Sequence, residues 1–245
     1  MKYKLLCTAV VICTLLSSGK PALTGQDVLK MMYSKYAGKW HKALTFKQTT
    51  ERYRNDTLRS KQTWRESMLY PDKLRIDIEP LADNNSIIFR GDSTYRIAAG
   101  QLKSASGQGN DLIFLLGGLY SYPLAQTIDK LKSLGYDITR AHEDTWKGKP
   151  VYVIGAGQGD LKVSQLWIDK EDLYLVRMIE FNKGTKEEAL FDDHLKVGNA
   201  WTETKVHFYI NDKLLQVESY YDVKDAPGLN AAIFDPTHYV KSDGQ

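Results

Sequence analysis

The five histidines are the side chains best suited to bind a metal ion or to exchange protons near neutral pH. They are scattered, and none lies in an HExxH pattern or another close ligand spacing. The stretch FDDHL, residues 191–195, places a histidine beside two acidic residues. Neighbouring side chains on a strand point to opposite faces, so Asp193 and His194 would not converge on one ion. We therefore expect no metal site and no cofactor, and interpret this stretch as surface charge.

Residues for nucleophilic catalysis are not evident either. Both cysteines, Cys7 and Cys13, lie near the N-terminus, and no serine lies in a GxSxG-type elbow. The stretch GAGQGD, residues 155–160, imitates a phosphate-binding loop. No helical pattern follows it, whereas a dinucleotide fingerprint requires one. The sequence therefore favours binding over catalysis, and we do not expect an enzyme.

The tripeptide Arg90-Gly91-Asp92 occurs in many cell-adhesion ligands. Here it lies inside SIIFRGDSTYRI, residues 86–97, between two stretches typical of strands. Glycine supplies backbone freedom and aspartate favours turns. We interpret the tripeptide as the turn of a β-hairpin rather than as an adhesion signal.

The first 19 residues have the three parts of a secretory signal peptide. MKYK is positively charged, Leu5–Leu16 is apolar or small, and SSG supplies small residues for cleavage after Gly19, or alternatively after Ala22. The apolar run is shorter than the roughly 20 residues that span a bilayer, which disfavours a retained membrane anchor. Neither cysteine follows a small residue, so lipidation is not expected.

These features predict an exported, periplasmic and soluble protein, with a signal peptide over residues 1–19 and a single domain over residues 20–245. Both cysteines would leave with the signal peptide, so a hydrophobic core must stabilise the mature chain without disulfides. The net charge is +3 and the basic residues are not clustered, so nothing indicates binding to nucleic acid.

The elements that must position a binding site begin with a helix. Thr24 and Asp27 resemble a capping box, and apolar residues recur at helical spacing up to Gly38. Four or five strands follow, of which KLRIDIE, residues 73–79, alternates most cleanly between apolar and polar. A helix is also expected over residues 121–135, and about six strands joined by short turns complete the chain.

An apolar insertion, DLIFLLGGLY over residues 111–120, interrupts the strands. It follows a polar, glycine-rich stretch, residues 104–110, that we expect to be mobile. The insertion has two interpretations. It is a lid whose motion the glycines at 107, 109, 117 and 118 allow, or a fixed helix of the core. The apolar run alone is compatible with both.

Several stretches of the chain resemble the periplasmic lipoprotein carrier family, LolA-like proteins. The resemblance lies in LTFKQTTE (44–51), ESMLYPDKLRIDI (66–78), SIIFRGDSTYRI (86–97) and APGLNAAIFDP (226–236), and it extends over essentially the whole mature chain. It implies an α+β fold, an incomplete antiparallel β-barrel of about ten or eleven strands covered by the N-terminal helix and central helices. It also implies a cavity that receives lipid or lipoprotein acyl chains.

One position departs from the family pattern. The resemblance places an arginine immediately before the proline at position 71, where it helps to set the ligand-releasing state, but this chain has Tyr70. A phenol offers one hydroxyl in place of the arginine's several donors. The departure affects the expected release mechanism and leaves the expected fold unchanged.

The candidate cavity residues are apolar or aromatic side chains on inward strand faces and on the insertion. They are Phe46, Trp64, Met68, Tyr70, Leu74, Ile76, Leu112, Phe114, Leu115, Trp167 and Phe181. Glu66 shares the expected inward face of Trp64 and Met68, either to meet a ligand head group or to lie at a solvated mouth.

The expected function is a carrier that binds lipid or lipoprotein acyl chains for transfer to the outer membrane, with membrane-bound release and acceptor proteins as partners. The alternative is an envelope sensor or structural module on the same fold, with a filled interior and a protein partner. A large apolar cavity would favour the carrier.

Overall fold

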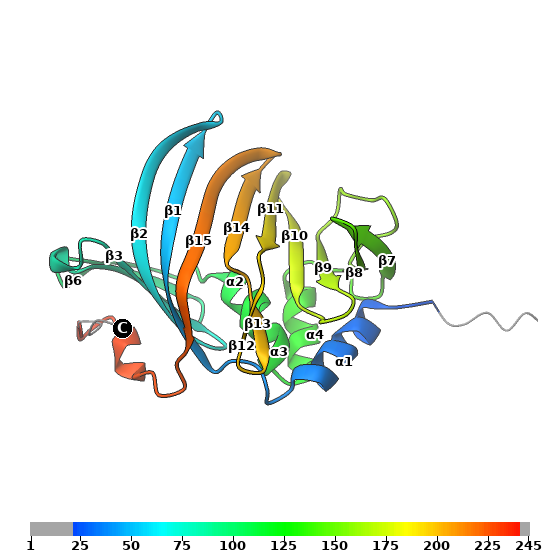
Figure 1. Ribbon diagram of the computed structural model, residues 1–245, viewed down its shortest axis with the longest axis horizontal. Coiled ribbons are helices and arrows are strands. Elements are labelled where there is room, and N and C mark those ends of the chain that lie inside the picture. Colours follow the sequence, from blue (N-terminus) through cyan, green and yellow to red (C-terminus); the bar gives the residue numbers. More distant parts are fainter. Residues whose placement is uncertain (1–21, 241–245) are drawn as a thin grey trace, which may run out of the picture.

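A computed structural model describes residues 22–240, so the expected signal peptide, residues 1–19, lies outside the described part of the chain. Figure 1 shows a long, strongly curved sheet that does not close on itself, with the helices of residues 25–36 and 111–133 gathered at one side. The helices are α1 (Gly25–Tyr36), η1 (Leu81–Asp83), α2 (Asp111–Ile113), the π-helical turn η2 (Phe114–Gly118), α3 (Leu119–Ser121), α4 (Leu124–Ser133) and η3 (Ala231–Phe234). No described helix is long and apolar enough to cross a membrane.

The strands of residues 22–240 form one antiparallel sheet of 13 strands, in the order β6-β5-β4-β3-β2-β1-β15-β14-β11-β10-β9-β8-β7, and one two-stranded hairpin, β12-β13. Their bounds are β1 (Ala43–Arg54), β2 (Thr57–Leu69), β3 (Lys73–Ile78), β4 (Asn85–Arg90), β5 (Ser93–Ala98), β6 (Gln101–Ser106), β7 (Ala141–Trp146), β8 (Lys149–Ile154), β9 (Gln165–Asp169), β10 (Leu175–Asn182), β11 (Thr185–Asp192), β12 (Leu195–Val197), β13 (Ala200–Thr202), β14 (Lys205–Ile210) and β15 (Lys213–Asp225).

The open antiparallel barrel of α+β class is therefore confirmed, but it has more strands than the ten or eleven expected. Two stretches that were each expected to form a single strand divide into pairs, β11 with β12 and β13 with β14. The first division lies at Asp193, which has a positive φ of 52°. Part of the glycine-rich stretch expected to be mobile, residues 104–106, pairs with β5 as the exposed edge strand β6.

The helix α1 begins as its sequence predicts. The Thr24 side chain accepts a hydrogen bond from the Asp27 backbone N–H, and the Asp27 carboxylate accepts one from the Thr24 backbone N–H, which completes a capping box. The buried side of α1 carries Val28, Leu29 and Met32, which pack in the largest core cluster with the helices and the strands β8–β11. Packing of this apolar face fixes the helix at one end of the sheet.

Gly91 and Asp92 form the two-residue turn between β4 and β5, where Arg90 pairs with Ser93. Gly91 has φ = +55°, a conformation that favours glycine, and its N–H donates to the Asp72 carbonyl oxygen at 3.0 Å. The prediction that this tripeptide forms a hairpin turn is confirmed.

The C-terminal segment returns along the outer face of the sheet, below β3 and β6 in Figure 1. Ile233 and Phe234 pack there against Ile88 and Ile97 of β4 and β5. Beside them the buried Arg75 guanidinium pairs with Asp77 at 2.8 Å and donates to the carbonyl oxygens of Ile233 and Val240. One buried cation thus links the sheet to the end of the described chain.

Candidate functional site

The inner face of the curved sheet and the helical insertion enclose a cavity of about 570 Å³ that is open to solvent. This volume lies within the ~300–1,000 Å³ of typical small-molecule sites. Its walls come from β1–β4, β10, β11, β14 and β15, and residues 108–116 cover it. The curvature of the long sheet therefore creates a space that the helices only partly fill.

One wall of the cavity is apolar because of strand alternation. In β2 and β3 the cross-strand pairs Glu66–Ile76 and Met68–Leu74 face the cavity, with Trp64 one alternate position further along β2. Side chains two residues apart lie on the same face of a strand, so these positions form a continuous surface. Ile87 and Phe89 of β4 extend it.

The insertion that covers the cavity is firmly anchored at its C-terminal end. The Trp40 indole N–H donates to the Leu116 carbonyl oxygen at 3.2 Å, and the Trp40 ring stacks on Tyr120 with centroids 3.6 Å apart. The Tyr120 hydroxyl accepts a hydrogen bond from the Leu175 N–H at 3.0 Å. These contacts favour the fixed interpretation for residues 116–120, so any opening would involve residues 108–115.

Gly117 has a packing role rather than the flexible role that the lid interpretation would give it. A Cβ atom at this position would overlap the ring of Tyr70, so only glycine lets the π-helical turn lie against that ring. The Tyr70 hydroxyl in turn donates to the Met68 sulfur at 3.4 Å. The residue that replaces the expected arginine therefore meets the insertion by ring packing against its backbone.

We expect Gly117→Ala to lower the free energy of unfolding by about 1–3 kcal/mol, the usual effect of overpacking. Urea titration measures this change. Gly107→Ala is the matched control, because no atom lies within 4 Å of its added Cβ. In a Tyr70→Leu background the Gly117→Ala effect should shrink, since the ring is gone. Equal effects in both backgrounds would contradict the proposed contact.

Part of the cavity lining is acidic and deeply buried. The side chains of Glu66, Glu203 and Glu218 form this part, and each residue is less than one-tenth exposed. Burial, reinforced by repulsion from Glu218, raises the pKa of the Glu203 carboxyl to about 8. Burial also raises the pKa values of Glu66 and Glu218, and the other two carboxyls raise that of Glu66 further. This arrangement can hold protons or a cation at neutral pH.

Sequence reasoning pointed to Glu66 but missed Glu203 and Glu218. Glu203 lies between β13 and β14 and Glu218 lies in β15, so both are far from Glu66 in sequence. Only the sheet order, which places β15 beside β1, brings them together. The one available signal was a glutamate two residues before an inward-facing tyrosine in β15, which is too common to stand out.

The structure places most of the sequence-predicted residues around the cavity. Those that line it are Phe46, Trp64, Met68, Leu74, Ile76, Leu112 and Leu115. Tyr70 and Phe114 pack beside it instead: Tyr70 lies against Gly117, and Phe114 lies in the core beneath Gly118. Their role is to support the cover of the cavity.

Trp167 and Phe181 lie away from the cavity, contrary to the expectation. Trp167 packs on the outer face against Trp146, with centroids 5.5 Å apart, and under the Arg177 guanidinium. Phe181 is 36% exposed, whereas its strand neighbours Glu180 and Asn182 face the cavity. The outer face of this end of the sheet has its own apolar cluster, so apolar character does not identify the inner face there.

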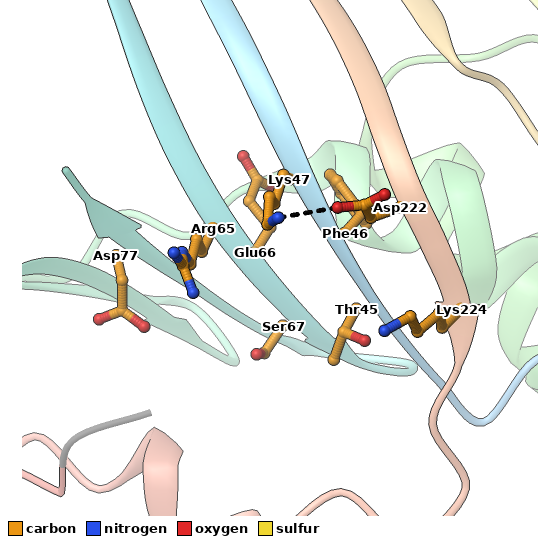
Figure 2. Close-up of a pocket in the computed structure, with 9 residues that line it drawn as sticks. All are labelled: Thr45, Phe46, Lys47, Arg65, Glu66, Ser67, Asp77, Asp222 and Lys224. Atoms are coloured by element: carbon orange, nitrogen blue, oxygen red, sulfur yellow. Dashed lines mark hydrogen bonds and ion pairs between the residues drawn. The ribbon is translucent and has the colours of Figure 1, made fainter. Parts of the chain in front are cut away.

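A much smaller hollow of about 70 Å³ lies on the opposite side of β1 and β2. Figure 2 shows its polar side chains, including the ion pair between Lys47 and Asp222 at 2.8 Å. The outward residues Thr45, Lys47 and Ser67 alternate with the inward ones of the same strands. This hollow is far below the volume of ordinary ligand sites, so it is not the candidate site.

The His194 side chain is more buried than the surface position that the sequence suggested. Its ring stacks on Tyr174 with centroids 3.9 Å apart, and Nε2 lies 3.0 Å from the Leu175 carbonyl oxygen. Burial lowers the pKa of His194 to about 4, so the ring is neutral at pH 7. Within residues 22–240, no three His, Cys, Asp or Glu side chains are arranged to hold a metal ion.

Comparison with known proteins gives the fold. No protein-family model and no curated protein matches the chain. Among solved structures, an outer membrane lipoprotein-sorting protein domain from Vibrio parahaemolyticus matches with a TM-score of 0.58 and 11% identity, covering 86% of this chain and 96% of that one. A LolA superfamily protein from Nitrosomonas europaea matches with a TM-score of 0.52 and 13% identity, covering 87% of this chain and 98% of that one.

A DUF1329 family protein from Desulfovibrio piger is similar to the same degree, with a TM-score of 0.56 and 14% identity, covering 86% of this chain and 95% of that one. The chain therefore has a LolA-like fold, as its sequence motifs indicated. At these identities the likeness concerns the fold alone.

Proposed function

We propose that the protein is a periplasmic carrier that binds lipid or lipoprotein acyl chains in the large cavity for transfer to the outer membrane. The observation that carries this proposal is the solvent-connected cavity of about 570 Å³ with an apolar wall on β2–β4. A LolA-like fold and the description of one structural neighbour as a lipoprotein-sorting domain support it. The signal-peptide pattern supports the periplasmic location.

Binding an acyl chain in the cavity requires no covalent reaction. Each methylene that leaves water contributes roughly 0.8 kcal/mol, so a chain of ordinary length supplies enough free energy for binding. A carrier must also release its cargo, which requires a loosely filled site. The empty space beside Trp64 and Met68 meets that requirement, and membrane-bound release and acceptor proteins are the proposed partners.

The alternative function, an envelope sensor or structural module, predicts a filled interior. The cavity weighs against that expectation, although the anchoring of residues 116–120 resembles a fixed plug. The carrier is therefore the better-supported function, and a ligand-binding measurement separates the two.

Dibromostearate should quench the fluorescence of Trp64, because bromine atoms quench a tryptophan that they contact and Trp64 lines the cavity. Trp40 and Trp167 pack elsewhere in the core. Titration of the purified protein should give saturable quenching that Trp64→Phe largely abolishes. Trp167→Phe is the matched control and should retain it. Quenching that survives Trp64→Phe would place the acyl chain outside this cavity.

A further inference from the structure

Three buried carboxyl groups line the cavity from separate elements. Glu66 comes from β2, Glu218 from β15, and Glu203 from the link before β14. Their exposed fractions are only 7%, 8% and 6%. Buried charges in proteins are normally paired, so three acids without a lysine or arginine among them require an explanation.

The internal hydrogen bonds satisfy only one of these acids fully. The Glu218 carboxylate accepts hydrogen bonds from the Gln216 amide at 2.5 Å and from the Tyr220 hydroxyl at 2.8 Å. Glu203 is approached by its own backbone N–H. Glu66 has no hydrogen-bond or ion-pair partner among residues 22–240, yet it faces the cavity. The Glu66 carboxyl is thus buried, unpartnered and directed into an open cavity, where a ligand could pair with it.

The charged and titratable surroundings leave room for a cation. Tyr70 and Tyr220 face the acids and remain neutral, because burial raises the pKa values of both hydroxyls far above their ordinary range. Within the described chain, Arg52 is the cation that acts on Glu218. It is exposed at the rim, with its guanidinium 5.5 Å from the centroid of the Trp64 ring. Among the described residues, no other lysine or arginine lines the cavity.

We propose that the Glu66–Glu203–Glu218 cluster is a subsite for the cationic nitrogen of an amphiphilic ligand whose alkyl chain lies along the apolar wall. This inference rests on the proposed carrier function and narrows its substrate class to ammonium-bearing amphiphiles. A cation placed among the three carboxyls relieves their mutual repulsion and gains charge-assisted hydrogen bonds. The aromatic rings of Trp64 and of the stacked pair Phe46–Tyr220 are further groups that attract cations.

Side chains of one strand, β2, can contact both the cationic nitrogen and the alkyl chain of such a ligand. On β2, Glu66 stands between Trp64 and Met68 on the cavity side, so a nitrogen bound at Glu66 leaves its chain against these two side chains. Leu74 and Ile76 of β3 lie directly opposite Met68 and Glu66. The same wall therefore contacts both parts of the ligand.

The test compares three probes of equal chain length by calorimetry at pH 8, each below its micelle concentration: dodecylamine, dodecan-1-ol and dodecanoate. Dodecylamine should bind about tenfold more tightly than dodecan-1-ol, the ratio expected from one charge-assisted hydrogen bond. In Glu66→Gln/Glu203→Gln the ratio should fall to within about threefold while dodecan-1-ol still binds. Glu171→Gln, an exposed site outside the cavity, should keep the wild-type ratio.

The outcomes separate this inference from the carrier proposal. If dodecan-1-ol or dodecanoate binds as tightly as dodecylamine, the cationic subsite is wrong and the carrier function stands. The same conclusion follows if the double variant, folded by circular dichroism, keeps the preference for the amine. If none of the three probes binds the wild-type protein, both proposals are overturned.

Discussion

Replacing Arg75 by methionine is expected to lower the free energy of unfolding by about 3–5 kcal/mol, the usual result of breaking a buried ion pair from one side. Arg75 and Asp77 are 2.8 Å apart, with side chains only 1% and 5% exposed. The substitution removes the guanidinium from Asp77 and also from the carbonyl oxygens of Ile233 and Val240. The midpoint and slope of urea unfolding measure the effect.

The control is an ion pair of the same length at the surface. Lys47 and Asp222 are also 2.8 Å apart, but their side chains are 32% and 54% exposed. Lys47→Met should therefore change stability by less than about 1 kcal/mol. The double substitution Arg75→Met/Asp77→Leu should recover part of the loss, because no charge is then left buried. A loss at Arg75 no larger than at Lys47 would show that burial does not govern this pair.

Stability should fall as the pH rises from 6.5 to 8 because of the acidic cluster. In the unfolded chain the Glu203 carboxyl ionises near the ordinary glutamate value of 4.5, but its folded pKa is about 8. Between these values the folded protein holds a proton that the unfolded chain has released, so each pH unit removes about 1.4 kcal/mol per proton. The stabilisation is complete below pH 4.5 and lost through pH 8, giving a fall of about 2 kcal/mol over the chosen range.

The range begins at pH 6.5 because, below that pH, His194 changes stability in the direction opposite to Glu203. Its folded pKa is about 4, so the unfolded chain binds its proton first as the pH falls. Chemical unfolding at several pH values gives the slope directly. Glu203→Gln should flatten this slope, whereas Glu171→Gln should leave it unchanged. A slope in Glu203→Gln equal to that of the wild-type protein would mean that Glu203 does not hold the proton.

The features that sequence predicts well are those set by local chemistry. The Thr24–Asp27 capping box, the turn at Gly91 and the alternation of β2 and β3 each depend on residues close in sequence. They were sufficient to place Trp64, Met68, Leu74 and Ile76 on one wall of the cavity. The motif resemblance supplied the arrangement of these elements as an open barrel.

Features that depend on distant pairing escaped prediction. Glu203 and Glu218 join Glu66 only because β15 pairs with β1 and β14 pairs with β15, which no local pattern encodes. Trp167 was assigned to the wrong face because both faces of the sheet are apolar there. Tyr70 looked like a loss of donors, whereas its ring packs on Gly117, a contact between residues distant in sequence that is visible only in three dimensions.

The central claim, that the cavity carries acyl chains, is tested most directly by native mass spectrometry of the protein purified from envelope extract without detergent, followed by organic extraction. We predict an added mass that extracts as a lipid or an acylated polypeptide, and that also identifies the cargo. A clean ligand-free mass, with no uptake of a fluorescent fatty acid added afterwards, would contradict a cargo cavity and favour the sensor or structural module.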